Sequence, residues 1–188
     1  MEYIFYLSLG AVAGLISGLF GLGGGAVIVP LLIFSFAAQD ISPEIATHLA
    51  IGTSLATIVV TSLSSIYTHH QKGAIRWELV RQLSPGIVVG SALGGLVAIS
   101  LNGTLLQLMF GSFMICIGLQ MLLYKPISVV GQKSSAPFLA VAGTGIGSIS
   151  ALIGIGGGVL TTPLLSHYGI KIHQSVASAA ACGFPIAL

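Results

Sequence analysis

The charged residues of this chain are few, and long uncharged segments separate them. Only ten of the 188 residues are Lys, Arg, Asp or Glu, which is about a fifth of the share usual in soluble domains. A helix needs ~20 apolar residues to cross a bilayer, and four of the uncharged segments are longer than that. A transmembrane barrel would instead need short alternating strands, so we predict an all-α integral membrane protein, a polytopic helix bundle. The uncharged segments are residues 3–39, 45–71, 82–124, 134–170 and 172–188.

Composition and motifs also exclude several kinds of function. The six Lys and Arg residues are not clustered as a nucleic-acid-binding surface requires, so we expect no nucleic-acid partner. None of the five His residues stands at a metal-ligand spacing such as HExxH. The sequence has no GxSxG motif to mark a serine nucleophile. We expect a protein that is not an enzyme, with no catalytic residues, no metal and no cofactor.

Turn residues and charges predict where the helices begin and end. One helix follows Ser42 and Pro43, which are favourable at the N-cap and in the first turn. Segment 82–124 is long enough for two crossings and has turn residues around Asn102, so it holds two helices. The helices predicted outside the glycine-rich segments are 46–68, 83–100, 104–124 and 174–188.

The charges of the loops predict the orientation of these helices. The loops at 72–81 and 125–133 contain most of the Lys and Arg residues, so both are expected on the cytoplasmic side. The loop at 40–44 has two acids and no base, and it is expected on the outer side. Segment 3–39 is compatible either with one crossing as a broken helix or with two crossings as a hairpin.

A 19-residue pattern of glycines and a proline occurs twice, 133 positions apart. A weaker match pairs residues 51–54 with residues 176–179. The protein is therefore predicted to contain two similar halves. The halves are parallel if a repeat crosses the membrane an even number of times, and inverted if the number is odd. The repeated residues are Gly21, Gly23, Gly24, Gly25 and Pro30 in the first copy, and Gly154, Gly156, Gly157, Gly158 and Pro163 in the second.

The duplication divides the chain into two repeats and a linker. The first repeat, residues 1–124, contains a broken helix over 3–39 and the three helices that follow it. A cytoplasmic linker, 125–135, precedes the second repeat. The second repeat, 136–188, has a broken helix over 137–168 and one further helix. Because it stops within its third segment, we expect either a fragment of a transporter or a bundle that is completed by homo-oligomerisation.

The adjacent glycines interrupt helices that lie within the membrane. Each glycine costs ~1 kcal/mol of helix propensity relative to alanine, and each freed backbone group in hydrocarbon costs several kcal/mol unless protein or a water-lined cavity satisfies it. A half-helix then begins at about Ala26 and again at about Val159, with unpaired amides and a positive dipole end. Two such ends meeting near the midplane would bind an anion without any basic side chain.

The alternative is that these glycines only let helices pack closely. Gly86, Gly90 and Gly94, at four-residue spacing, are expected to do that. Single glycines favour the packing alternative. Duplication of the whole break together with its proline favours a binding site.

Helix 46–68 has one face of small and hydroxyl side chains. Such a face either lines a permeation path or consists of hydroxyls that bond to carbonyls of their own helix. We favour a path only near Thr53 and Ser54. His48, at the outer end of the same helix, either binds an anion when protonated or is a hydrogen-bonded interfacial residue, and the second is favoured. The face consists of Thr47, Ala50, Ser54, Thr57, Thr61, Ser64 and Thr68.

Three motifs together resemble the TauE/SafE family of sulfite exporters and related anion permeases. They are the duplicated Gly-x-Gly-Gly-Gly with its downstream proline, Ile-Gly-Thr-Ser-Leu at 51–55, and Gly-Ala-Ile-Arg-Trp at 73–77. The resemblance extends over essentially the whole chain. It implies a multi-pass permease of a bacterial-type inner membrane that transports sulfite, sulfonates or related sulfur anions.

The resemblance also implies which residues bind the substrate. They are the repeated glycines and prolines of both breaks together with Thr53 and Ser54, and the weaker match adds Ser178 opposite Thr53. The expected function is secondary transport of a small anion, sulfite or an organosulfonate, that is held at paired half-helix N-termini. The bilayer, the anion, a coupling ion and a second copy of the chain are the expected partners. The alternatives are a passive anion channel and a non-transporting membrane scaffold.

Overall fold

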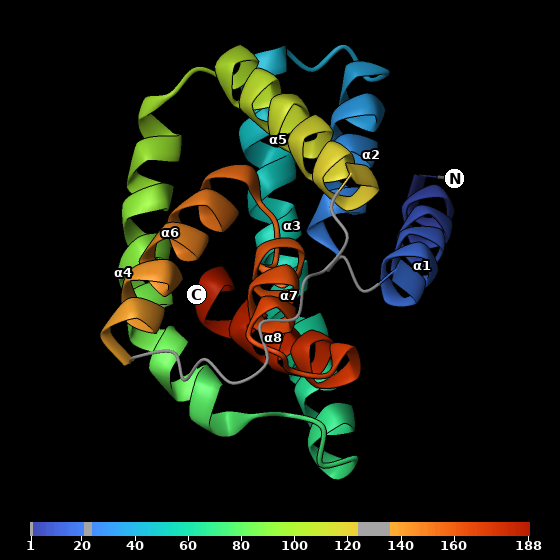
Figure 1. Ribbon diagram of the computed structural model, residues 1–188. Coiled ribbons are helices and arrows are strands. Elements are labelled where there is room, and N and C mark those ends of the chain that lie inside the picture. Colours follow the sequence, from blue (N-terminus) through green and yellow to red (C-terminus); the bar gives the residue numbers. More distant parts are fainter. Residues whose placement is uncertain (1, 21–23, 124–135) are drawn as a thin grey trace.

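The computed structural model describes residues 2–20, 24–123 and 136–188 (Figure 1). These residues form helices and no strand, which confirms the predicted all-α class. Three of the helices are long and apolar enough to cross a membrane: α3, α4 and the Gly103–Gln120 part of α5. The helices are α1 (Glu2–Phe20), α2 (Gly25–Ala37), α3 (Pro43–Gln71), α4 (Trp77–Ser100), α5 (Gly103–Leu123), α6 (Ala136–Ile153), α7 (Gly158–His167) and α8 (Ile172–Ala187).

Several of these bounds differ from the predicted ones. The largest difference is in α4, which begins at Trp77 and not at residue 83. Glu78 lies in its first turn, where the helix dipole favours an acid, while Val80 on the same turns is buried. A charged but amphipathic first turn therefore continues the helix beyond its apolar part. The predicted linker at 125–135 lies outside the described residues.

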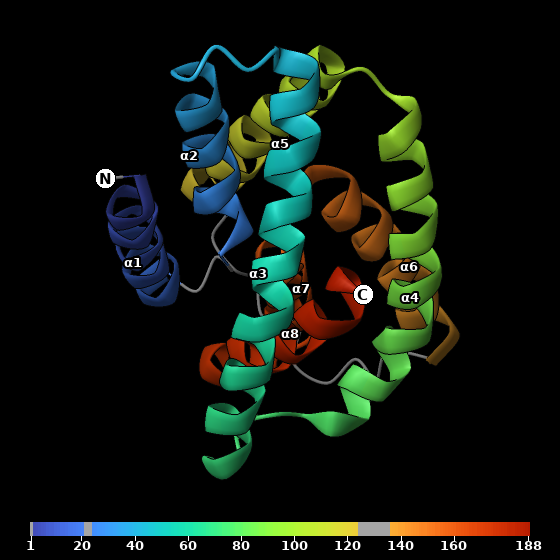
Figure 2. The same ribbon diagram turned by 180° about the vertical axis from the view of Figure 1, so that it is seen from behind.

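Helix α3 is the centre of the bundle. It packs against α2, α5 and α8, and both views show it with α1 and α2 on one side and α4 and α6 on the other (Figures 1 and 2). Its buried Ile51 belongs to the same core cluster as Ile153 and Ile155, which lie at the glycine break of the second repeat. The largest buried side chains of the two core clusters are Leu83, Ile87, Leu139, Leu165, Val29, Leu106 and Ile155.

Helices α4 and α6 form the most extensive helix pair, and glycines make their close contact possible. A Cβ atom at Gly86, Gly90 or Gly94 of α4 would collide with a backbone carbonyl of α6. In the other direction, a Cβ at Gly147 of α6 would collide with the carbonyl oxygen of Ile87. The predicted packing role of Gly86, Gly90 and Gly94 is confirmed.

The two repeats run in opposite directions. In both views α1 runs downward from the N-terminus, and α2 and α6 run upward (Figures 1 and 2). Helix α7 runs downward in Figure 1. Segment 3–39 is thus a pair of antiparallel helices. The corresponding pair in the second repeat is upside down relative to it. This is the inverted arrangement that an odd number of helices in the first repeat, α1 to α5, requires.

Candidate functional site

The start of α2 lies directly against the second glycine break. Helix α2 begins at Gly25 and α7 at Gly158, each one residue before the predicted start. A Cβ atom at Gly25 would collide with the carbonyl oxygen of Gly154 and would lie 2.9 Å from the Cα of Ile155. The structure therefore brings the two repeats together at this point. Gly21 and Gly23 lie outside the described residues, and Gly24 is the N-cap of α2.

Ser54 connects α3 to the same break. Its side chain is fully buried, and its hydroxyl donates a hydrogen bond of 2.8 Å to the carbonyl oxygen of Gly154. The position that a Cβ of Gly25 would occupy is 2.9 Å from the Ser54 Oγ. Of the predicted site residues, Gly25, Ser54 and Gly154 thus form one contact cluster, although 100 positions separate Ser54 from Gly154.

The backbone of the second break requires glycine at two positions. Gly154 has a φ of 77° and Gly157, the N-cap of α7, has a φ of 69°, a region that glycine enters without steric cost. Gly156 packs against the side chain of Ile58. A Cβ atom at Gly183 of α8 would lie 3.1 Å from the carbonyl oxygen of Gly156. Helices α3 and α8 therefore both contact the break.

The first turn of α7 holds polar groups that lack partners. The first amides of a helix have no acceptor within it, and the described part of the chain offers none to the buried amides of Gly158 and Val159. The Thr161 hydroxyl, one turn along, is fully buried and also lacks a partner among the described residues. Its Oγ1 is 3.7 Å from the position of a Cβ at Gly157. A buried polar group that stays unpaired costs about 1–3 kcal/mol.

Further hydroxyls of the second repeat share this property. Ser150 of α6, at 1% exposure, and the half-buried Thr162 and Ser166 of α7 have buried oxygens without a hydrogen-bond partner in the described ranges. Thr162 and Ser166 are one helical turn apart on α7. Hydroxyl groups without partners are therefore concentrated on and next to this helix.

Apolar side chains close the second break in this conformation. Ile58 covers Gly156, Ile186 covers Gly157, and Ile51 lies against Gly154. Every residue from 153 to 159 is buried.

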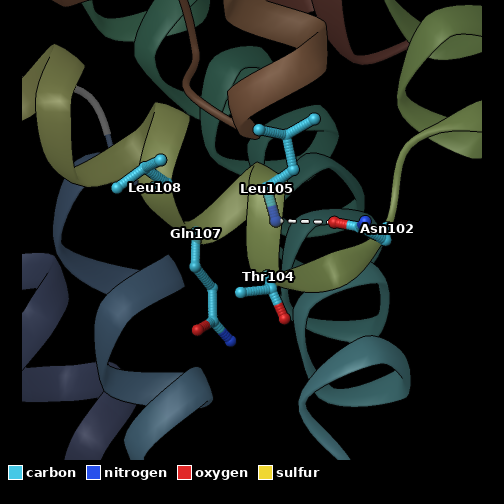
Figure 3. A pocket seen from close by; sticks show the side chains of 5 residues that line it. All are labelled: Asn102, Thr104, Leu105, Gln107 and Leu108. Atoms are coloured by element: carbon cyan, nitrogen blue, oxygen red, sulfur yellow. Dashed lines mark hydrogen bonds between the residues drawn. The ribbon is translucent and has the colours of Figure 1, made fainter.

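An open hollow lies elsewhere, at the start of α5 (Figure 3). Asn102 caps this helix, because its Oδ1 accepts a 2.8 Å hydrogen bond from the Leu105 amide. Thr104 and Gln107 point to the opposite side from Leu105 (Figure 3), and the Gln107 amide donates to Thr47 Oγ1 at 2.7 Å. Asn102 thus caps α5, and Gln107 joins α5 to α3.

Other predicted site residues lie away from the breaks. Thr53 is on the exposed side of α3, Pro30 is half-buried inside α2, and Pro163 is exposed inside α7. Ser178 is buried, but its Oγ accepts a 3.0 Å hydrogen bond from the Arg76 amide at the start of α4.

Gly183 of α8 is a further residue at the second break. Ser54 contacts this break at Gly154, and Gly183 contacts it at Gly156. The match of residues 51–54 with residues 176–179 stays a prediction.

The hydroxyl face of α3 and His48 have structural roles. Thr57, Thr61 and Thr68 each donate to a carbonyl of their own helix, as the second alternative for this face predicts. His48 faces two carbonyl oxygens, with Nδ1 at 2.8 Å from Glu44 O and Nε2 at 3.1 Å from Ala98 O. His48 is therefore a hydrogen-bonded residue, as the favoured alternative predicts, and it connects α3 to α4.

Sequence reasoning missed Thr161 and Ser150. The signal for Thr161 is an asymmetry between the repeats. After the glycines, the first copy reads Ala-Val-Ile-Val-Pro and the second Val-Leu-Thr-Thr-Pro, so hydroxyls replace two branched apolar residues within an otherwise matching motif. Ser150 has no such signal. Among the described residues, no three His, Cys, Asp or Glu side chains come together as metal ligands.

Comparison with known proteins gives the family. The profile of the sulfite exporter TauE/SafE family matches residues 6–188. The chain belongs to the TauE/SafE family. This agrees with the resemblance carried by the glycine motifs, and it makes the chain a membrane protein of a transporter family and not an enzyme.

Curated TauE/SafE relatives are named as probable membrane transporter proteins. One from Haemophilus influenzae is 38% identical over 94% of this chain and 67% of its own length. The probable membrane transporter protein YunE of Bacillus subtilis is 31% identical over 88% of this chain and 67% of its own. A relative from Methanocaldococcus jannaschii is 28% identical over 94% and 67%. The chain spans about two thirds of the length of these relatives, and no solved structure matches it.

Proposed function

We propose that this chain carries the substrate site of a secondary transporter and holds a small sulfur oxyanion at the N-terminus of α7, next to the start of α2. The observation that supports this most is the set of buried donors without partners: the amides of Gly158 and Val159 and the hydroxyl of Thr161. Each donates to an anion, and the dipole of α7 adds a favourable potential at this end.

The chemistry of the site fits an oxyanion better than a cation or an apolar ligand. Two backbone amides and one hydroxyl at the start of α7 match the several acceptor oxygens of sulfite or an organosulfonate. The start of α2, which contacts Gly154, adds a second helix N-terminus. No Lys or Arg is needed, because backbone amides and a helix dipole supply the positive potential. The family name, sulfite exporter, supports the choice of a sulfur oxyanion.

The closed conformation favours a carrier over an open channel. Ile58 and Ile186 cover the break, so the site opens only when helices move, as in alternating access. The inverted repeats give two related conformations that open to opposite sides of the membrane. Secondary transport also requires a coupling ion or the substrate's own gradient.

We place this multi-pass protein in the inner membrane with the 72–81 loop in the cytoplasm. The Lys and Arg residues of that loop support this orientation.

Flux of sulfite and of methanesulfonate into proteoliposomes tests this proposal with the full-length protein. Thr161→Val keeps the shape of the side chain and removes one donor to the anion. A hydrogen bond to a charged group contributes about 1.5–3 kcal/mol, so flux at low substrate should fall by tenfold or more on the scale of about 1.4 kcal/mol per factor of ten.

Thr68→Val is the matched control. Its hydroxyl is exposed and donates to Ser64 O within α3, so flux should stay at the wild-type level. Equal flux for the wild type and both variants, at equal protein insertion, would contradict the assignment of the site.

A further inference from the structure

A hollow opens at the start of α4, beside the turn between α7 and α8. Its volume is about 370 Å³, so it has room for a small anion together with several waters at ~30 Å³ each. Arg76 and Ile170 both line it, and Trp77 and Glu78 lie beside Arg76 in its wall. The hollow therefore places a cationic side chain next to the residues that follow α7.

Contacts with the second repeat hold the backbone of Arg76 at this position. Its amide donates a 3.0 Å hydrogen bond to the Oγ of Ser178, which is fully buried on α8. The preceding Ile75 is buried in a core cluster that contains residues of both repeats. The side chain of Arg76 is exposed, so its guanidinium is accessible to anions from the solvent.

Positive charge is concentrated at this end of the molecule. The 72–81 segment and the turn after α7 contain four bases and one acid, whereas the loop at 40–44, at the other end of α3, has two acids and no base. A cleft with one predominant charge raises the local concentration of the opposite ion and speeds its arrival by about 10- to 1000-fold. The bases are Lys72, Arg76, Arg81 and Lys171, and the acid is Glu78.

One face of α7 leads from the proposed anion site toward this hollow. Gly158, Thr162 and Ser166 stand at four-residue spacing, so they share a face and follow one another by ~6 Å. The hydroxyl oxygens of Thr162 and Ser166 are buried and have no hydrogen-bond partner in the described part of the chain. Four residues beyond Ser166 comes Ile170, in the wall of the hollow. The face therefore offers hydroxyl groups between the anion site and the hollow.

We propose that the hollow at the start of α4 is an entry site where small oxyanions collect, and that they pass from it along the Thr162–Ser166 face to the start of α7. This inference rests on the proposed function and adds to it the side from which the anion enters. Arg76 attracts the anion, and the carboxylate of Glu78 keeps binding in the hollow weak. Weak binding suits an entry site, because a tightly held ion does not move on.

Quenching of Trp77 fluorescence by iodide tests the entry site with the full-length protein. Trp77 lines the hollow and is the one tryptophan of the sequence; any tryptophan outside residues 1–188 is replaced by phenylalanine. Arg76→Gln should lower the iodide quenching constant by about twofold or more, because fewer anions collect. Quenching by neutral acrylamide should stay unchanged, and Glu78→Gln should raise the iodide quenching constant.

Arg81→Gln is the matched control. It removes the same charge from an exposed residue of α4 that does not line the hollow, so iodide quenching should stay at the wild-type level. An equal fall in Arg76→Gln and Arg81→Gln would overturn the inference, as would an equal change in acrylamide quenching, which reports shape and not charge. The proposed transport site fails on a different result, full flux in Thr161→Val, so the two outcomes are distinguishable.

Flux into proteoliposomes tests the path along α7. Thr162→Val combined with Ser166→Ala removes both hydroxyls of the face and should slow sulfite flux by about tenfold, without changing iodide quenching of Trp77. Thr68→Val combined with Ser112→Ala should leave flux unchanged, because these hydroxyls are exposed and bond within their own helices. Wild-type flux in the Thr162 and Ser166 double variant would overturn the path.

Discussion

At the scale of single residues, Gly25 makes a close backbone contact between the two repeats. Gly25→Ala places a Cβ against the carbonyl of Gly154 and 2.9 Å from Ile155 Cα, both of which are backbone and cannot rotate away. Overpacking of this kind costs about 1–3 kcal/mol. Thermal unfolding in detergent should therefore show a lower midpoint for this variant.

The control for this glycine is Gly52→Ala on α3, where a Cβ meets no described atom within 4 Å. Alanine is favoured over glycine within a helix by ~1 kcal/mol, so this variant should be as stable as the wild type or slightly more so. If both variants lost the same stability, the contact of Gly25 with the second break would be refuted.

Ser54 donates one of the hydrogen bonds that join the two repeats. Ser54→Ala leaves the buried carbonyl of Gly154 without its 2.8 Å donor, and an unsatisfied buried acceptor costs about 1–3 kcal/mol. Chemical unfolding should show that loss. Ser100→Ala serves for comparison, because its exposed hydroxyl donates only to Leu96 O of its own helix. A Ser54→Ala variant as stable as Ser100→Ala would mean that the hydrogen bond is absent in the membrane.

The sequence was sufficient to select some of these residues but not to place others. Gly25 and Ser54 were identifiable because each belongs to a motif with a physical role, a helix break or a buried hydroxyl. Ser178 was selected from a weak alignment, and its hydroxyl bonds instead to the Arg76 amide. The partner of a single hydroxyl depends on tertiary contacts, and periodicity along one helix carries no information about them.

At the scale of helices, the α4–α6 pair depends on glycine. Gly90→Ala directs a Cβ into the Thr144 carbonyl and should separate the two helices, at a cost of about 1–3 kcal/mol. Gly95→Ala on the same helix points into open space and should be tolerated. Unfolding midpoints of the two variants, measured side by side, check this, and equal midpoints would show that close backbone contact does not stabilise the pair.

Helix starts were predictable where a backbone signal exists. The glycine breaks placed the starts of α2 and α7 within one residue, because several adjacent glycines end a helix whatever surrounds them. The start of α4 was misplaced by six residues, from Trp77 to residue 83. Charges were taken as the end of the helix, although a helix that leaves the bilayer continues into water when its first turn has a buried side, here at Val80.

At the scale of the whole molecule, the inverted repeats predict which loops share a side of the membrane. Glu44 and Lys72 lie near opposite ends of α3 and are exposed. With Cys116 and Cys182 replaced by Ala, Glu44→Cys should react with an impermeant maleimide in intact cells. Lys72→Cys should react only after the membrane is opened. The reverse pattern would contradict the orientation predicted from the loop charges.

The direction of the second repeat could not be read from the sequence. A duplicated motif reports that two halves are alike, but their relative direction depends on how many times the first half crosses the membrane. That number was open because segment 3–39 suited both one crossing and two. The antiparallel course of α1 and α2 decides it, and α2 packs against both α1 and α3 (Figure 2).

The central claim is that an oxyanion binds at the N-terminus of α7, and anomalous diffraction tests it most directly. Crystals of the full-length protein would be soaked with selenite, whose selenium scatters anomalously and takes the place of the sulfur in sulfite. The account predicts a selenium peak within hydrogen-bond distance of the Gly158 and Val159 amides and of Thr161 Oγ1. A peak only beside Lys72 and Arg76 in the cytoplasmic loop, with the start of α7 empty, would contradict it.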